Sequence, residues 1–165
     1  MKRLLIAVMI AFGLSGCGYH LRGSTGGNWN LGRFSIQSPT ATASEVTRLL
    51  QLNGVELVSP EKADAILTFT KDNQERQVLS VDPDTGKVRE FELTVDVGIQ
   101  VKSSDGKILL EDDSIALQRD FTFDETAALG KYEEEGALYQ EIRKDLAAAI
   151  VRRLQAMHLT EAASK

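Results

Sequence analysis

A strict alternation between apolar and polar residues constrains the fold of this 165-residue chain more than any other feature. Every second position from 91 to 101 is apolar, and the residues between them are polar or glycine: the apolar set is Phe91, Leu93, Val95, Val97, Ile99 and Val101. A helix would scatter these side chains around its circumference, whereas a strand places all of them on one face. The pattern therefore predicts a strand in an antiparallel sheet that is covered on one side and meets water on the other.

Turn-forming residues bound this strand and place further strands beside it. The stretch 82–86 (DPDTG) precedes it and 104–106 (SDG) follows it, and both are typical of tight turns. Alternation over 63–81 predicts a preceding strand, and Ile115, Leu117 and Phe121 predict a following one. If extended throughout, 63–81 would span about 60 Å, which is more than a domain of this size needs. We therefore expect the hairpin to bend or bulge, or its tip to project as a candidate contact element.

Two segments have helical periodicity. Residues 40–52 carry a short apolar stripe and end before Asn53-Gly54, which is a typical helix stop. Residues 133–157 repeat apolar residues at spacings of three and four: Leu138, Ile142, Leu146, Ile150, Leu154 and Met157. With a short strand at 34–37, this order predicts an α+β two-layer sandwich. Two helices would pack on one face of a mostly antiparallel, roughly four-stranded sheet, forming a single domain over 34–159 with a tail at 160–165.

The first sixteen residues have the organisation of a secretory signal. Lys2 and Arg3 precede an apolar run over 4–14, which is too short to span a bilayer because a spanning helix needs about 20 residues. The only cysteine, Cys17, ends the string LSGC, which matches the lipobox of bacterial lipoproteins. We therefore expect residues 1–16 to be removed and Cys17 to carry a covalent lipid. A cysteine that merely belongs to the signal, or one in an intermolecular disulfide, is the alternative.

Residues beyond this cysteine predict how the anchor is used. Gly18 follows the cysteine where an aspartate would favour retention in the inner membrane, so we expect the outer membrane. Residues 17–33 are rich in glycine and small polar residues, which predicts a flexible tether from the membrane to the domain. Several acyl chains hold a protein on a membrane where one chain barely would.

Composition and motifs argue against catalysis and nucleic-acid binding. The chain from Cys17 onward has 17 basic and 24 acidic residues, a net charge of −7, which does not favour nucleic acid. His20 and His158 are the only histidines and are far apart in sequence. Carboxylates at 111–113 and 133–135 are explained by a solvated turn and a charged helix start. We expect no enzyme, no metal and no cofactor besides the covalent lipid, with a hydrolase of cell-wall or lipid substrates as the alternative.

Three basic residues are candidates for phosphate binding. Lys87 and Arg89 follow the predicted turn at same-face spacing, and Lys131 comes just before the second predicted helix. Lysine offers a point charge and arginine a bidentate fork to phosphate oxygens. The alternative is ordinary solubilising charge, since the chain as a whole is acidic.

Two stretches carry a resemblance to a known family. Residues 17–22 (CGYHLR) resemble the mature N-terminus of the LptE (RlpB) lipopolysaccharide-assembly lipoproteins, and 49–58 (LLQLNGVELV) resembles the family's helix-to-strand junction. The resemblance implies a lipoprotein on the periplasmic side of the outer membrane. It would plug the lumen of the β-barrel LptD in a one-to-one complex, bind lipopolysaccharide and help deliver it to the outer leaflet. A stand-alone periplasmic lipid-binding lipoprotein without a barrel is the alternative.

The resemblance also implies where lipopolysaccharide is contacted. Family members place basic residues at the hairpin tip and before the last helix, and Lys131 matches the second position. The tip departs from the family pattern because Asp84 occupies it, with Lys87 and Arg89 just beyond. The resemblance therefore favours Lys131 as a phosphate contact more than the two hairpin residues.

Overall fold

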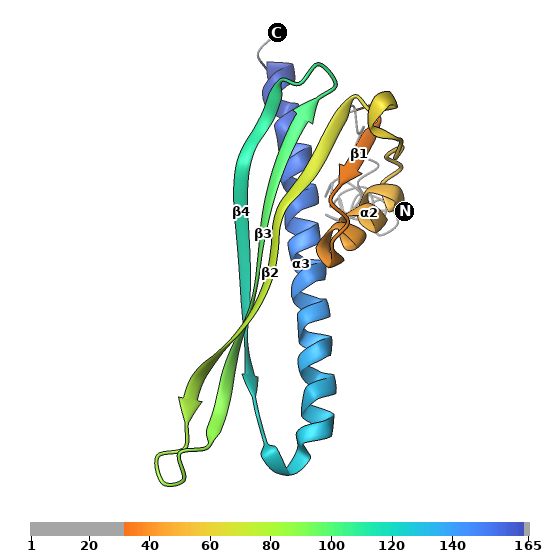
Figure 1. Cartoon of the computed structure of the whole chain (residues 1–165). Coiled ribbons are helices and arrows are strands. Elements are labelled where there is room, and N and C mark those ends of the chain that lie inside the picture. The colour runs from red at the N-terminus through yellow and green to blue at the C-terminus, as the bar shows by residue number, and fades with distance from the viewer. Residues whose placement is uncertain (1–31, 164–165) are drawn as a thin grey trace, which may run out of the picture.

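The computed structural model describes residues 32–163, with side chains described as far as Met157. The elements in chain order are β1 (Phe34–Gln37), α2 (Ala41–Leu52), β2 (Ala65–Val81), β3 (Val88–Ser103), β4 (Ile108–Thr122) and α3 (Ala128–Ala163), with single turns of 3₁₀-helix at Pro60–Lys62 and Glu125–Ala127. The sheet order is β1-β2-β3-β4; β1 is parallel to β2 and the other neighbours are antiparallel. Figure 1 shows the two helices beside this sheet, which confirms the predicted α+β two-layer fold.

The hairpin of β2 and β3 is the longest feature of the sheet. Its register shifts at Phe69/Lys71 and again between Val78 and Val81, so the predicted bulges are present. Figure 1 shows the hairpin running away from β1 and α2 to the end of the molecule at which β4 leads into α3. We call this end, made of residues 78–91 and 121–132, the distal end.

The core lies between β3 and the two helices. Five apolar residues of β3, at alternate positions 93–101, are buried, as are Ile142, Leu146, Ile150 and Leu154 of α3. The alternation in the sequence and the helical stripe therefore both face the interior, as predicted. On α2, Val46 and Leu50 close the same core near β1.

The predicted limits of the second helix, 133 and 157, were wrong at both ends. Helix α3 begins at Ala128 and continues to Ala163, so it includes most of the predicted tail. At its start, the Asp124 side chain accepts a hydrogen bond from the Thr126 N–H, which forms a 3₁₀ turn that leads into the helix. Gly130 has low helix propensity, so the sequence pattern did not indicate the first turn of α3.

Polar contacts hold α3 over the sheet on both sides of its apolar stripe. On the β2 side, Arg76 pairs with Glu135 at 3.0 Å; on the β4 side, Arg119 pairs with Asp145 at 2.6 Å. The Tyr139 hydroxyl also donates to the backbone carbonyl oxygen of Glu75 in β2 at 2.9 Å. Beneath this part of α3, the buried residues of β3 therefore lie between charged residues of β2 and β4.

The opposite face of the sheet carries the polar members of the alternating pattern. Asp96 of β3 accepts a hydrogen bond from Ser114 of β4 and pairs with Lys71 of β2, while Glu92 accepts one from Gln118. Within the described residues, neither helix covers this face. The prediction of a sheet that is packed on one side and polar on the other is confirmed.

Among the described residues, Arg33 connects the segment before β1 to the start of β2. The backbone N–H and the guanidinium of Arg33 both donate to the Asp64 carboxylate. Gly32 has a φ of +67°, and a Cβ there would lie 2.4 Å from an Asp64 oxygen. The end of the predicted tether is thus held to the start of β2. Residues 1–31, which contain the predicted signal, Cys17 and the rest of the tether, lie outside the described residues.

Candidate functional site

The three predicted phosphate-binding residues all lie at the distal end. Lys87 directly precedes β3, Arg89 is in β3, and Lys131 is in the first turn of α3. The prediction that Lys131 precedes the helix was wrong because the helix begins at Ala128. The fold therefore brings to one end residues that are more than forty positions apart in the sequence.

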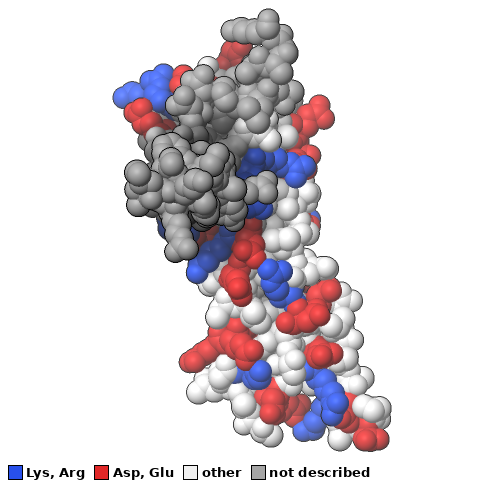
Figure 2. All heavy atoms as spheres, turned by 180° about the vertical axis from the view of Figure 1, so that it is seen from behind, with Lys and Arg blue, Asp and Glu red and all other residues white. Residues whose placement is uncertain are grey.

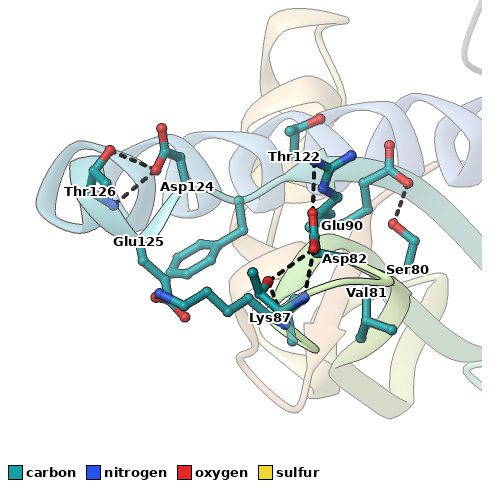
Figure 3. A pocket seen from close by; sticks show the side chains of 13 residues that line it. Ser80, Val81, Asp82, Lys87, Glu90, Thr122, Asp124, Glu125 and Thr126 are labelled. Carbon is teal, nitrogen blue, oxygen red and sulfur yellow. Dashed lines mark hydrogen bonds and ion pairs between the residues drawn. The ribbon is translucent and has the colours of Figure 1, made fainter.

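A pocket of about 700 Å³ opens between the hairpin and the connection from β4 to α3. It is lined by hairpin residues between 80 and 90 and by residues 122–126 (Figure 3). Lys87 and Arg89 line this pocket, whereas Lys131 does not. The structure thus groups the two hairpin cations and leaves the third outside the group.

Asp82 organises the tip of the hairpin. Its Oδ1 accepts hydrogen bonds from the backbone N–H of Asp84 at 3.0 Å, from that of Thr85 at 2.9 Å and from the Thr85 hydroxyl at 3.0 Å. These hydrogen bonds, led by the backbone N–H of Thr85, lower the pKa of the Asp82 carboxyl below its ordinary value. Its other oxygen lies 2.9 Å from Nη2 of Arg89. A single carboxylate therefore fixes both the turn and the cation.

Lys87 connects the hairpin to the segment before α3. Its Nζ lies 2.5 Å from Oε2 of Glu125, in the 3₁₀ turn. Figure 3 shows the Lys87 side chain extending toward Glu125. The hydrogen bond to Glu125 raises the pKa of the Lys87 ammonium. In that turn, Asp124 accepts hydrogen bonds from the hydroxyl and the N–H of Thr126, and these lower the pKa of Asp124. The partner of Lys87 is thus presented by a locally ordered turn.

Lys131 is much less accessible than the other two cations. Its side chain is 22% exposed, against 62% for Lys87 and 66% for Arg89. Its Nζ lies 2.8 Å from Oε2 of Glu134 and 5.5 Å from the centre of the Phe121 ring. Exposure alone therefore favours the two hairpin cations as ligand contacts, which reverses the order that the resemblance suggested.

Each of the three cations has a carboxylate partner, so the distal end has no strongly positive field. The pocket lining includes Lys87 and Arg89 but four acidic residues: Asp82, Glu90, Asp124 and Glu125. Basic and acidic side chains are also intermixed over the described part of the face seen in Figure 2. Exposed ion pairs contribute little to stability, so a phosphate group can replace a carboxylate as the partner of an exposed cation.

Sequence reasoning missed the aromatic cluster behind the pocket. The Phe91 and Phe123 rings meet edge to face with centroids 5.6 Å apart, and the Phe123 and Tyr132 centroids are 6.1 Å apart. Phe121 completes the cluster at 6.5 Å from Phe91. The string FTF at 121–123 was the available signal, but the contribution of Tyr132 depends on how α3 packs.

Over residues 32–163, no group of three or more histidine, cysteine, aspartate or glutamate side chains is placed to hold a metal ion. In the same part of the chain, no helix combines the length and the apolar character that a bilayer crossing requires.

Known proteins resemble this chain over most of its length. The family model for LptE, described as lipopolysaccharide-assembly, matches residues 31–154. An LPS-assembly lipoprotein LptE from Photorhabdus laumondii is 31% identical over 160 residues, which cover 94% of this chain and 85% of that protein.

Solved structures resemble the fold as well. Rare lipoprotein B from Shewanella oneidensis is 27% identical with a TM-score of 0.68, and the match covers 79% of this chain and 97% of that one. A lipoprotein B from Nitrosomonas europaea is 29% identical with a TM-score of 0.71, over 88% of this chain and 94% of that one. The resemblance therefore extends from the sequence to the arrangement of helices and strands.

Proposed function

Because this chain belongs to the LptE family of lipopolysaccharide-assembly lipoproteins, we propose that it plugs an outer-membrane barrel of the LptD kind and contacts lipopolysaccharide through its distal end. The single observation that carries the second part is the grouping of two highly exposed cations, Lys87 and Arg89, at one pocket. A lipid phosphate offers two or three acceptor oxygens, which suit the arginine fork and the lysine ammonium.

The membrane attachment is proposed from the sequence. The thiol of Cys17 would carry diacylglycerol, and the amine exposed by cleavage before it would be acylated. Each methylene buried in the bilayer contributes about 0.8 kcal/mol, so two or three chains retain the protein on the membrane. Because the anchor lies on the periplasmic side of the outer membrane, the domain would enter the barrel through its periplasmic opening.

The polar face of the sheet supports a place inside a barrel. The lumen of a large outer-membrane barrel is polar and wet, so its occupant needs no apolar collar. The face bearing Glu92, Asp96 and their hydrogen-bonded neighbours meets that requirement. In this role the protein is a non-enzymatic assembly and transport component that acts by binding. The alternative, a lipoprotein that carries lipid without a barrel, needs the same distal end but no partner for the polar face.

Isolation of the native protein tests the proposal. A C-terminally tagged full-length chain should be extracted from outer membranes in mild detergent, and its partners and its N-terminal mass measured. We expect a one-to-one complex with a large barrel, and an N-terminal peptide that begins at an acylated Cys17. A Cys17→Ala variant is the matched control, because it should lose the lipid and leave the outer-membrane fraction. A wild-type chain that is isolated without any barrel would support the lipid-carrier alternative instead.

A further inference from the structure

Exposed apolar side chains are concentrated at the distal end, and the proposed phosphate contacts give them no role. Seven large hydrophobic side chains among the described residues are exposed, and five of these lie at the distal end: Val78, Leu79, Val81, Leu129 and Tyr132. The other two, Leu52 and Ile108, end α2 and begin β4. Scattered exposed hydrophobics are ordinary, whereas a local concentration marks a contact surface.

Four of these five side chains are connected through aromatic rings into one surface. Val78 is paired in register with Phe91, whose ring meets that of Phe123, and the Phe123 ring in turn meets that of Tyr132. Leu129 lies one helical turn before Tyr132, at the i, i+3 spacing that places two side chains side by side. Val81 lines the same pocket as Phe123. We call Val78, Val81, Leu129 and Tyr132, with the rings beneath them, the distal apolar patch.

The surroundings of the patch indicate what it binds. Lys87 and Arg89 line the pocket together with Val81 and Phe123, so cations border the apolar side chains. This juxtaposition matches a molecule with a phosphate next to hydrocarbon. It does not match the wall of a barrel lumen, which is polar and would leave the apolar side chains without a suitable partner.

We propose that the distal apolar patch contacts acyl chains of the lipid whose phosphate meets Lys87 and Arg89. This inference rests on the proposed function and adds to it, because it makes the hydrocarbon of lipopolysaccharide, as well as its charge, part of what is recognised. The acyl chains would lie over Val81, Leu129 and Tyr132. The phosphate would replace the carboxylates of Asp82 and Glu125 as the ion-pair partner of the two cations.

Binding to two probes tests this assignment. The first probe is purified lipopolysaccharide, and the second is the same material after alkaline removal of its acyl chains with the phosphates retained. The variant is the full chain with Val81→Thr and Leu129→Gln, two changes that remove apolar surface at exposed positions and keep similar volumes. Leu52→Gln is the matched control, because Leu52 is 71% exposed and Leu129 is 79% exposed, each at a helix end.

We expect the double variant to bind intact lipopolysaccharide about tenfold more weakly than the wild type, and the deacylated form with unchanged affinity. The Leu52→Gln control should bind both probes as the wild type does. Equal binding of intact lipopolysaccharide by wild type and double variant would overturn the inference but leave the proposed function standing. Failure of the wild type to bind either probe would overturn both. A double variant that loses only its barrel partner would assign the patch to the barrel, which also overturns the inference.

Discussion

The hydroxyl of Thr70 donates a 2.6 Å hydrogen bond to a carboxylate oxygen of Asp112, across strand β3 and over Gly98. This contact ties β2 to β4, two strands that are not neighbours in the sheet. It lies at the first bulge of β2, between Phe69 and Lys71, just beyond the part of β2 that pairs with β1. The bridge therefore marks the point from which the hairpin continues toward the distal end without β1.

Gly98→Ala should destabilise the protein because the bridge leaves no room for a side chain. A Cβ at Gly98 would lie 2.4 Å from the Thr70 hydroxyl oxygen and 3.2 Å from Cβ of Lys71. We expect the free energy of unfolding to fall by about 1–3 kcal/mol, measured by chemical denaturation. Adding Thr70→Ala should restore part of the loss by removing the nearest atom.

The matched control for this change is Gly136→Ala in α3. A Cβ at Gly136 would meet nothing within 4 Å, and alanine is the better helix former. We expect this substitution to stabilise the protein by up to about 1 kcal/mol. If Gly98→Ala stabilised the protein to the same degree, the contact over β3 would not exist in solution.

Leu146→Ala should be the more damaging kind of change, because Leu146 is fully buried between α3 and the sheet. Removing its methyl groups leaves a cavity, and we expect a loss of about 2–5 kcal/mol in the free energy of unfolding. Leu52→Ala, at an exposed position, should change stability by less than about 0.5 kcal/mol. Similar losses for the two variants would mean that α3 does not pack as described.

The burial of Leu146 could be predicted from the sequence, whereas the bridge over Gly98 could not. The burial of Leu146 follows from the spacing of apolar residues in the helix, because the apolar stripe of a helix is buried against the apolar face of a strand. The bridge over Gly98 could not be predicted, because it depends on the register of three strands and on a bulge. The parallel pairing of β1 with β2 was not visible either, since alternation does not tell which strands are neighbours.

The basic residues of the candidate site could be predicted from the sequence, but the carboxylates that pair with them could not. Basic residues near a turn are visible in the sequence, so Lys87 and Arg89 were found. Their partners Glu125 and Asp82 were not, because ion pairs between distant segments depend on the final positions of both backbones. The low exposure of Lys131 and the position of its ammonium group near the Phe121 ring were not predictable either, because both depend on the packing of α3.

Glu125→Gln should strengthen the binding of phosphate groups by releasing Lys87 from its ion pair. Deacylated lipopolysaccharide is the probe, and the affinity should rise a few-fold at low salt and fall toward the wild-type value as salt is added. Asp84→Asn is the charge-matched control: Asp84 lies at the same tip and has no ion-pair partner among the described residues. Equal gains from both variants would show that only total charge matters and that the Lys87–Glu125 pair does not limit binding.

The hairpin tip should lose stability in acid. The folded pKa of Asp82 is below its ordinary value of 3.8, so its hydrogen bonds contribute stability above that pH. This contribution is lost as the pH falls through the lowered pKa. The contribution of Lys87 to stability has the opposite pH dependence, because its pKa is raised above 10.5. Its ion pair contributes fully below that pH, and the contribution is lost as the pH rises through the raised pKa.

An NMR titration would measure this directly. The amide protons of Asp84 and Thr85, which donate to Asp82, should shift with a midpoint below 3.8. The transition should be absent in Asp82→Asn. A midpoint at or above 3.8 would mean that the turn is not held by this carboxylate in solution.

Site-specific photo-crosslinking in living cells tests most directly whether the distal end contacts lipopolysaccharide. A photoreactive amino acid would replace Val81, which lines the distal pocket, or Leu52, at the end of α2, and crosslinked lipopolysaccharide would be detected with an antibody. We predict a strong lipopolysaccharide adduct from position 81 and none above background from position 52. An adduct from position 52 alone, or equal adducts from both, would contradict the account.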